Sequence, residues 1–440
     1  MNDQHVTVLG GGFAGLAAAQ RVRELDGSAT VFEKKNFLGG HAHSMARDGF
    51  TFDEGPHVSF TKIPEVKELL AKSIDHQHHE FASVVQNYFQ GHWVKHPAQV
   101  NLHGLPPDLI TRCVMDFLKV AADPPSQKPD CYADWLLAQY GETFAREFPF
   151  RYTRKYWAAE PEEMTTSWIG PRMYQPNIQE VIRGAVGAVE ENKHYIKNFR
   201  YPEQSGFGAY TNALMSDAEY HMEYSVERID PKNRTIEFQN GDRHQYERLI
   251  SSLPLPELIP RIEGVPRNVL DAVDRLVCTS LAVVDVGVRR DAGFPDGHWL
   301  YFYDEDICFA RANYPHLLAR SNAPAGCGSI QVEVYYTKHR PLPYQDVLNR
   351  AIEDMGRVGM LKPDDDIILS QVRHVKYGNV MYNNERDRNL AVVESYLDDL
   401  GIVRCGRYGL WNYHWTDQSI TSGWDAAAMA LGKYEKQVQA

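Results

Sequence analysis

The order of apolar and polar positions near the N-terminus predicts a strand, a glycine turn, a helix and a second strand. Residues 5–9 are a short apolar run, and the turn GGGFAG over residues 10–15 follows it directly. Residues 16–25 carry a helical repeat, and residues 29–33 form a second apolar run that ends in an acidic residue. This succession is typical of a βαβ unit built on a parallel sheet.

Each glycine of the Gly-x-Gly-x-x-Gly turn has a separate physical role. Gly10 permits the tight turn, Gly12 lets a pyrophosphate approach the backbone, and Gly15 lets the helix pack against the strand. The helix N-terminus then faces the phosphates, and Glu33 can accept hydrogen bonds from ribose hydroxyls. Because all these parts fall in register, a Rossmann-type dinucleotide site is favoured over a purely structural turn.

A second glycine pair indicates that the dinucleotide is FAD rather than NAD. Gly39 and Gly40 follow shortly after Glu33, and this doublet allows a second close approach to the backbone. A cofactor that extends beyond its pyrophosphate requires such an approach. The loop Asp53–His57 then looks like a return to the cofactor, although His57 could instead be a loop histidine with structural contacts only.

The rest of the chain divides into further units. Residues 76–200 are mostly helical in pattern, with helices expected over 132–148 and 177–192. Residues 218–253 are strand-like with a hairpin signal at Asn240-Gly241, and residues 278–380 alternate as β-strands do. We therefore predict an α/β fold, in which a Rossmann-type FAD-binding domain carries a helical insertion and a mixed β-sheet substrate domain. The predicted boundaries are 1–75, 205–260 and 396–440 for FAD binding, 76–204 for the helical insertion, and 261–395 for the sheet domain.

Composition narrows the range of partners. The 440 residues are 43% hydrophobic and 24% charged, which is an ordinary globular composition for two or three structural units. The net charge of −12 is spread along the chain and disfavours nucleic acid and anionic lipid as partners. No apolar stretch reaches the length of a membrane span, and the six cysteines show no paired spacing, so we expect a reduced, cytoplasmic protein. The oligomeric state stays open, a homo-oligomer included.

One group of residues suggests a metal site but does not support it. His76, His78, His79 and Glu80 are close in sequence, yet no second pair of ligands follows at a suitable spacing. A solvated loop explains the group better, and we assign no metal.

Further motifs are spread from the first strand to the last helix. They are DEGPHVSF at 53–60, KYW at 155–157 with WIGPR at 168–172, WLYF at 299–302 with FAR at 309–311, and GRYGLWNY at 406–413 with DQ at 417–418. Together with the glycine turn they resemble the flavoprotein superfamily that contains amine oxidases, protoporphyrinogen oxidase and UDP-galactopyranose mutase. Within that superfamily the middle motifs are most similar to the mutase.

The resemblance implies a function and a set of site residues. It implies an FAD-dependent, redox-neutral pyranose/furanose isomerisation of a nucleotide sugar, with N5 of reduced flavin as the nucleophile at the anomeric carbon and an electron donor to reduce FAD. Catalytic positions would be His57, Arg172 and Arg311. Substrate contacts would be Trp157, Tyr301, Asn379, Tyr382 and Tyr413. Cofactor contacts would be Gly10, Gly12, Phe13, Ala14, Gly15, Glu33, Lys34, Gly40, His41, His57, Val226, Gly406, Arg407, Asp417 and Gln418.

Independently of the resemblance, the chemistry of the predicted substrate residues fits an anionic nucleotide sugar. Arg172 and Arg311 carry fixed charges that can bind a diphosphate in a bidentate manner. Tyr301 and Tyr413 could donate neutral hydrogen bonds to the same oxygens, and Trp157 could stack on a sugar or base. The alternative for each arginine is an ordinary surface or ion-paired residue.

One departure from the mutase pattern keeps other functions open. Mutases carry a tyrosine in a Tyr-Pro segment that contacts the diphosphate, and here that position falls on Asn379 without the proline. Tyr377 or Tyr382 could compensate. The main alternative is an FAD-dependent oxidoreductase of the amine oxidase or protoporphyrinogen oxidase type that acts on a small molecule. A flavin-binding protein without catalysis is a second alternative.

Overall fold

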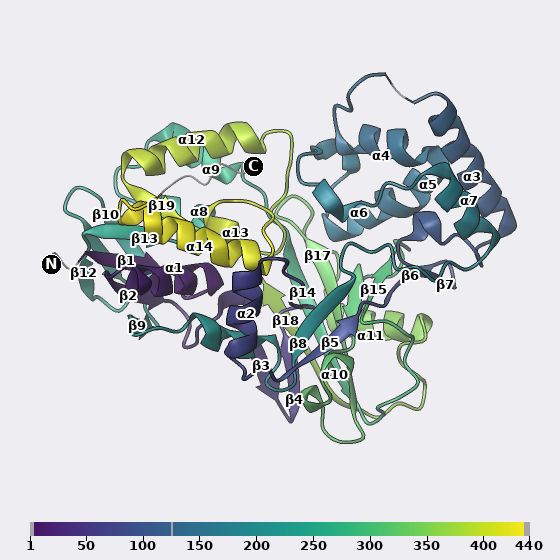
Figure 1. Cartoon of the computed structure of the whole chain (residues 1–440), viewed down its shortest axis with the longest axis horizontal. Coiled ribbons are helices and arrows are strands. Elements are labelled where there is room, and N and C mark those ends of the chain that lie inside the picture. The colour runs from purple at the N-terminus through teal and green to yellow at the C-terminus, as the bar shows by residue number, and fades with distance from the viewer. Residues whose placement is uncertain (1–3, 125, 435–440) are drawn as a thin grey trace.

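The first layer of the molecule is a parallel sheet whose strands come from both ends of the chain (Figure 1). The computed structural model describes residues 4–124 and 126–434. In the sheet order β19-β13-β1-β2-β9, every neighbouring pair is parallel. The strands are β1 (His5–Leu9), β2 (Ser28–Glu33), β9 (Glu219–Met222), β13 (Arg248–Ser251) and β19 (Ile402–Arg404). The predicted Rossmann-type unit is therefore confirmed, and the structure adds strands from distant segments to it.

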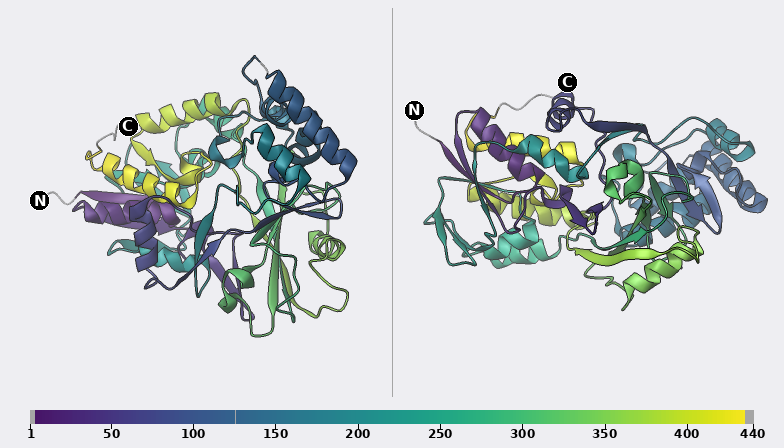
Figure 2. Two further views of the ribbon diagram at one scale, coloured as in Figure 1. Left: turned by 45° about the vertical axis from the view of Figure 1, so that its right-hand side comes forward. Right: turned by 90° about the horizontal axis from the view of Figure 1, so that it is seen from below.

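Helices from the two ends of the chain lie together against this sheet. Both views of Figure 2 show α14 (Thr416–Ala430) beside α1 (Phe13–Glu24). They approach so closely that a Cβ atom on Gly423 would lie 2.2 Å from the carbonyl oxygen of Ala14. Only glycine fits there. This contact places the closing motif of the chain next to the glycine turn of residues 10–15.

A small antiparallel sheet and several helices complete this part of the molecule. The hairpin predicted at Asn240-Gly241 joins β11 (Thr235–Phe238) to β12 (Arg243–Gln245), and β10 (Val226–Asp230) pairs with β11. The associated helices are α2 (Pro64–Lys72), α8 (Leu255–Leu258), α9 (Arg267–Asp274), α12 (Arg386–Asp399) and α13 (Gly406–Gly409).

The second large element is a seven-stranded mixed sheet in the order β18-β14-β17-β16-β15-β6-β7. Its strands are β6 (Val85–Phe89), β7 (His92–Lys95), β14 (Ser280–Val288), β15 (Trp299–Phe302), β16 (Arg311–Asn313), β17 (Gly328–Tyr336) and β18 (Ile367–Val375). All neighbours are antiparallel except β15 and β6, which are parallel. The smaller elements near it are β3 (Ser44–Arg47), β4 (Phe50–Asp53), β5 (His78–Ala82), β8 (Asn198–Pro202), α10 (Pro315–Leu318) and α11 (Val347–Arg357).

The range 76–204 differs from the predicted helical insertion because it also contains strands. β6 and β7 join the mixed sheet, and β5 pairs with β8. In β6 buried and partly exposed residues alternate, but the strand is only five residues long. A period of two over so few positions is hard to distinguish inside a helix-rich stretch.

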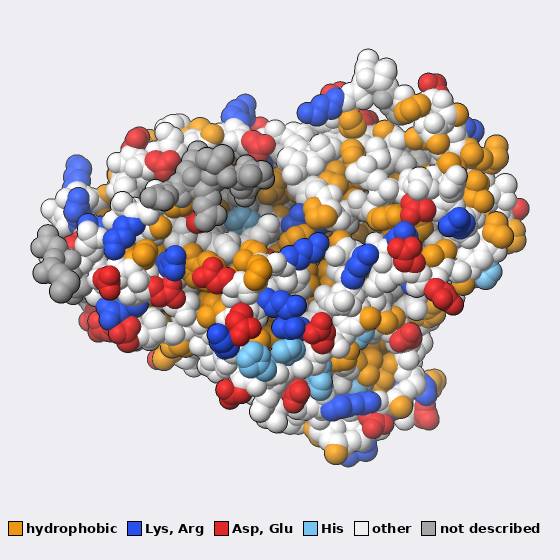
Figure 3. Space-filling model, viewed as in Figure 1, with side chains coloured by type: hydrophobic (Ala, Val, Ile, Leu, Met, Phe, Trp, Pro, Cys, Tyr) orange, Lys and Arg blue, Asp and Glu red, His pale blue; other side chains and the backbone are white. Residues whose placement is uncertain are grey.

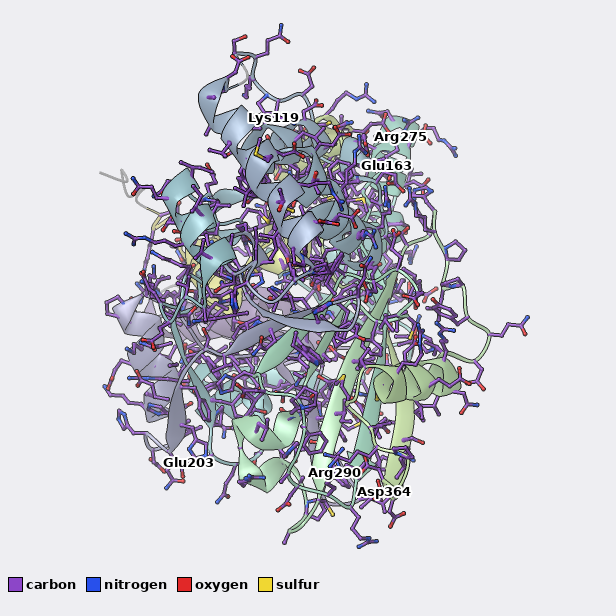
Figure 4. The ribbon with its side chains drawn as sticks, turned by 90° about the vertical axis from the view of Figure 1, so that its right-hand side faces the viewer. Lys119, Glu163, Glu203, Arg275, Arg290 and Asp364 are labelled. Carbon is purple, nitrogen blue, oxygen red and sulfur yellow. The ribbon has the colours of Figure 1, made fainter. Side chains whose placement is uncertain are left out.

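The helical part of this range forms a lobe beside the mixed sheet (Figure 1). Its helices are α3 (Pro107–Ala122), α4 (Tyr132–Tyr140), α5 (Glu142–Ala145), α6 (Arg151–Tyr156) and α7 (Ile178–Val186). The predicted helix 132–148 is interrupted at Gly141, whose φ is +74°. The predicted helix 177–192 begins at the Asn177 cap and ends earlier, at Val186. Seen from the side of the lobe (Figure 4), Lys119 of α3 lies above the sheet and Arg290 lies at the sheet's lower end.

The surface agrees with the spread of charge along the chain. On the face drawn in Figure 3, acidic and basic side chains are interspersed. None of the helices in residues 4–124 and 126–434 has the length and apolar character needed to cross a membrane.

Candidate active site

The glycine turn leaves the N-terminus of α1 open to a ligand. Gly10 adopts a φ of +99°, and a Cβ atom on Gly15 would lie 1.9 Å from the carbonyl oxygen of Gly10. Gly12 is the N-cap residue, and no side chain in the described part of the chain caps the helix there. The first N–H groups of α1 therefore face outward without a side-chain acceptor, which is the arrangement that binds phosphate.

Glu33 and the second glycine pair lie beside this turn. The Glu33 carboxylate accepts hydrogen bonds from the backbone N–H groups of Gly11 at 2.7 Å and Lys35 at 2.9 Å. A Cβ atom on Gly40 would lie 2.9 Å from Cα of Gly12, so the two glycine segments touch. Glu33 thus holds the turn, and its remaining lone pairs could accept ribose hydroxyls.

The loop that carries His57 is fixed at its start. The backbone carbonyl of Asp53 accepts hydrogen bonds from Gln331 at 2.9 Å and Arg373 at 2.8 Å. His57 Nδ1 lies 3.1 Å from the carbonyl oxygen of Gly55. Burial lowers the pKa of His57 to about 4, so its imidazole is neutral at pH 7.

Glu54, the second residue of the loop, has a carboxylate with a shifted pKa. Glu54 pairs with His41 and lies 3.8 Å from Lys35 Nζ. Burial by itself would raise the pKa of Glu54, but the hydrogen bond and charge of His41, with the charge of Lys35, lower it to about 2. His41 is thereby held at the edge of the loop.

Tyr413 lies between two arginines, Arg172 and Arg407, that have no acidic partner among the described residues. Arg172 Cζ is 4.6 Å from the ring centroid of Tyr413, and Arg407 Cζ is 5.3 Å from it. Arg172 donates to the carbonyl oxygen of Tyr413 at 2.7 Å, whereas its buried Nε–H has no acceptor in the described part of the chain. Arg407 donates to the carbonyl oxygen of His414 at 2.8 Å. Within residues 4–124 and 126–434 neither arginine pairs with a carboxylate, so the pair leaves an excess of positive charge at Tyr413.

A carboxylate neutralises the charge of Arg311, which lies near the same tyrosines. We call this group the arginine–tyrosine cluster, and its members are Arg172, Arg311, Arg407, Tyr156 and Tyr413. It forms a two-pronged ion pair with Glu333, one contact of which is 2.8 Å. Its Cζ lies 5.8 Å from the ring of Tyr156, and the hydroxyls of Tyr156 and Tyr413 are 2.8 Å apart. The two arginines predicted to bind a diphosphate are therefore connected through a pair of tyrosines.

The comparisons with known proteins now decide the family. The family described as flavin-containing amine oxidoreductase matches residues 13–431. The chain belongs to this family. FAD is accordingly its cofactor, and the protein is an FAD-dependent enzyme.

Solved structures narrow the likeness within the family. The chain is similar to reduced UDP-galactopyranose mutase, with a TM-score of 0.92 and 25% identity over 98% of this chain and 96% of the other. A candidate protoporphyrinogen oxidase from Exiguobacterium sp. 255-15 shares the fold, with a TM-score of 0.74 and 16% identity over 98% and 100% of the two chains. The predicted superfamily and its mutase-like character are confirmed.

One group of curated relatives matches a short segment of the chain. A 4,4'-diapophytoene desaturase from Staphylococcus aureus (strain Newman) is 43% identical over 61 residues, which are 14% of this chain. The match spans 12% of that relative's length. Such a short match does not extend the desaturase activity of that protein to this chain.

The predicted substrate residues contact the arginine–tyrosine cluster in different ways. Trp157 is 2% exposed and packs against Tyr413, with ring centroids 5.2 Å apart. Tyr301 lies directly across from Arg311 in the sheet. The Tyr382 hydroxyl donates a hydrogen bond to Asn412 and accepts one from the backbone N–H of Tyr413, both at 3.2 Å. It therefore holds the backbone of Tyr413 in place.

Asn379, which occupies the position of the mutase tyrosine, is buried. Its backbone N–H donates to the Thr279 hydroxyl at 2.8 Å, and its Nδ2 group has no partner in the described part of the chain. Tyr377, the other candidate for compensation, accepts at its carbonyl oxygen a hydrogen bond from Tyr408 at 2.8 Å. Neither residue touches Tyr413 through a hydrogen bond.

The remaining predicted cofactor residues lie around the parallel sheet. Lys34 reaches Glu257 at 3.3 Å, and Val226 is buried at the start of β10. The backbone N–H of Gly406 donates to Ser422 of α14 at 2.9 Å. In the first turn of α14, Gln418 caps the helix by accepting from Trp415 N–H at 2.9 Å, and Asp417 accepts from the N–H of Gln418 at 2.8 Å.

Sequence reasoning missed several residues of the cluster. Tyr156 stands next to Trp157, but nothing local showed that its hydroxyl meets Tyr413. Trp415 provides a second aromatic face for Arg172, with Cζ 4.3 Å from its ring. For Tyr156 the available signal was its position inside the motif at 155–157, whereas Trp415 lies between the motifs at 406–413 and 417–418. Glu333 lies in an alternating strand and gave no signal of its own.

Proposed function

We propose that this protein is an FAD-dependent mutase that interconverts the pyranose and furanose forms of a nucleotide sugar. The observation that carries the proposal is the positive charge at Tyr413, where Arg172 has, among the described residues, neither a carboxylate partner nor an acceptor for its buried Nε–H. A diphosphate supplies both the charge and the acceptors that this site lacks. The similarity to reduced UDP-galactopyranose mutase over nearly the whole chain supports the same reading.

The residues around the parallel sheet fit FAD. The turn at Gly10, Gly12 and Gly15 and the open N-terminus of α1 would hold the pyrophosphate, and Glu33 would accept from the ribose. Gly40 and Gly406, with φ of +59° and +77°, keep side chains out of the space beside the turn. Phe13, Ala14, His41, Lys34, Val226, Asp417 and Gln418 remain the other proposed contacts.

In this proposal the protein residues bind and stabilise the leaving group. Reduced FAD, when bound, would supply a nucleophilic nitrogen for the anomeric carbon. Arg172 and Arg407 would hold the diphosphate and stabilise its charge as the glycosidic bond breaks. The Tyr156 hydroxyl would donate to that of Tyr413, which would donate its own proton to a diphosphate oxygen, and Arg311 would add one free edge of its guanidinium.

His57 would have a positioning role. Its imidazole is neutral at pH 7 because burial lowers its pKa to about 4, so it can neither release a proton nor add positive charge there. Its hydrogen bond to Gly55 at 3.1 Å fixes the ring within the loop that would face the flavin. An electron donor must keep the flavin reduced in the cell.

The experiment compares dithionite-reduced and oxidised protein with UDP-galactose, UDP-glucose and other nucleotide sugars. A product of the same mass that forms only with reduced protein is expected, and it should disappear in Arg172→Ala. Arg183→Ala is the matched control, because Arg183 is an exposed residue of α7. No isomer from any sugar would reject the proposal.

A second function is oxidation of a small molecule by FAD. The observation that favours it is buried Asn379 at the position where mutases carry the diphosphate tyrosine. Bleaching of the oxidised flavin by a trial amine, without any sugar isomer, would assign the protein to that class.

A further inference from the structure

A row of polar side chains crosses one face of the mixed sheet. Glu333 of β17 pairs in register with Arg311 of β16, Arg311 pairs with Tyr301 of β15, and Tyr301 pairs with Asn87 of β6. Residues directly opposite each other in neighbouring strands point to the same face, about 4.8 Å apart. The four side chains therefore form a continuous line from β17 to β6.

The two ends of this row have different neighbours. At one end a Cβ atom on Gly55 would lie 2.5 Å from Glu333 Oε1, which places the His57 loop beside Glu333. Asn87 stands at the other end, farthest from that loop. If the proposed function holds, the sugar lies at the flavin and the diphosphate at the arginines. The nucleoside must then extend along the row towards Asn87.

His96 is held at this far end in one orientation. Its Nδ1 lies 2.9 Å from Asn87 Oδ1, and its ring centroid is 5.0 Å from that of Tyr301. Asn87 is fully buried, and its Nδ2 donates to the carbonyl oxygen of Lys95 at 3.5 Å. Tyr303 also donates to Asn87 Oδ1, at 3.4 Å. These contacts identify Oδ1 as the atom that faces His96, so the imidazole proton sits on Nδ1.

The other nitrogen of His96 is consequently a free acceptor. No group in residues 4–124 and 126–434 hydrogen-bonds to His96 Nε2. Burial lowers the pKa of His96 well below its usual range, which keeps the lone pair of Nε2 at pH 7.

A buried histidine next to His96 has a ring nitrogen without a hydrogen-bond partner among the described residues. The His194 ring lies 5.1 Å from that of His96, the residue is 2% exposed, and its Nε2 has no partner in the described part of the chain. Buried polar atoms of proteins are rarely left unpaired. The buried Nε2 of His194 and the free acceptor of His96 lie on neighbouring rings, and His96 packs against Tyr301, so we expect a ligand group there.

We infer that His96 reads the base of the bound nucleotide by accepting a hydrogen bond from a ring N–H. Uracil and guanine carry such an N–H on their pairing edge, whereas cytosine and adenine present a bare ring nitrogen there. A bare nitrogen would face the lone pair of Nε2 and leave both acceptors unpaired. The Tyr301 and Tyr152 rings, 5.4 Å apart, provide aromatic surface beside the base. This inference rests on the proposed nucleotide sugar site.

The test measures binding of UDP, CDP and inorganic pyrophosphate to the FAD-loaded protein by calorimetry. The native protein should bind UDP roughly tenfold more tightly than CDP, as expected for one unmet buried hydrogen bond. His96→Phe should reduce that ratio to about twofold or less and leave pyrophosphate binding unchanged. His96→Gln, whose amide both donates and accepts, should bind both nucleotides about equally and covers the case in which His96→Phe does not fold.

His92→Phe is the matched control because His92 lies on β7, in the same hairpin, and its UDP preference should persist. Equal binding of UDP and CDP by the native protein, or a ratio unchanged in both His96 variants, would overturn the inference. If sugar isomerisation is observed and the ratio does not depend on His96, only this inference fails. If neither nucleotide nor pyrophosphate binds the native protein, the proposed function fails with it.

Discussion

The hydroxyl groups of Tyr156 and Tyr413 lie 2.8 Å apart and join the helical lobe to the C-terminal segment of the chain. Tyr156 is the last residue of α6, and Tyr413 follows α13. The two residues are 257 positions apart in the sequence. Arg311 stands over the ring of Tyr156, while Arg172 and Arg407 stand over that of Tyr413. The pair is therefore the point at which three arginines from different parts of the chain converge.

Tyr156→Phe should weaken diphosphate binding. The substitution removes the hydroxyl that orients Tyr413 and costs about 1 kcal/mol, or roughly fivefold in the Kd for UDP. Calorimetry with UDP checks the value. Tyr152→Phe is the matched control: its ring stacks on Tyr156 at 5.2 Å, but its buried hydroxyl has no partner in the described part of the chain. Equal Kd values for Tyr156→Phe and the native protein would remove this hydroxyl from the site.

Glu333→Gln should make the stability of the protein depend on a bound anion. Glu333 is 2% exposed, and its carboxylate neutralises Arg311. Without it, an unpaired charge remains buried, which costs roughly 3 kcal/mol in the free energy of unfolding.

A bound diphosphate would compensate this loss because it provides new acceptors for Arg311. The increase in Tm on adding UDP should therefore be larger for Glu333→Gln than for the native protein. Thermal denaturation with and without UDP measures both values. An increase of the same size in the two proteins would show that Arg311 does not meet the ligand.

The local parts of this fold could be predicted because their signals are contiguous. The turn at Gly10 and the hairpin at Asn240-Gly241 each depend on backbone conformations that a few neighbouring residues determine. Two of the long strands of the mixed sheet, β14 and β17, carry runs of alternating residues that are likewise contiguous in sequence.

The missing parts depend on pairings between distant segments. The parallel pairing of β6 with β15 joins residues more than two hundred positions apart, and no local period encodes it. Likewise, Arg311 could be identified as a fixed charge, but its neutralisation by Glu333 follows from the register of β16 and β17. The sequence therefore identifies the charged residues of the site, but the net charge of the site depends on strand register and could not be predicted.

His194 should make the protein sensitive to mild acid. Burial lowers the pKa of His194 from 6.5 to about 4 in the folded protein, so the unfolded chain binds a proton that the folded protein excludes. Stability is then lost as the pH falls from about 6.5 towards 4, by about 2 kcal/mol at pH 5.

Replacing this histidine tests that contribution directly. In His194→Phe the decrease in Tm between pH 7 and pH 5 should be smaller than in the native protein. His92→Phe, a partly exposed histidine of β7, should retain the native decrease. Parallel Tm curves for His194→Phe and the native protein would contradict the prediction.

Gly423→Ala should destabilise the cofactor domain because α14 cannot move away from α1 without losing its packing. A new Cβ atom would lie 2.2 Å from the carbonyl oxygen of Ala14 and 2.9 Å from the N atom of Ala18, and both are backbone atoms that cannot rotate aside. We expect overpacking to cost about 1–3 kcal/mol and to weaken FAD retention, since α1 begins at the glycine turn.

Gly356→Ala is the matched control: this glycine also lies inside a helix, α11, and its Cβ would meet nothing within 4 Å. It should be neutral or more stable by up to about 1 kcal/mol, as alanine favours helices. Chemical denaturation followed by flavin and tryptophan fluorescence separates the two variants, and equal midpoints would mean that the helices are less tightly packed than the structure requires.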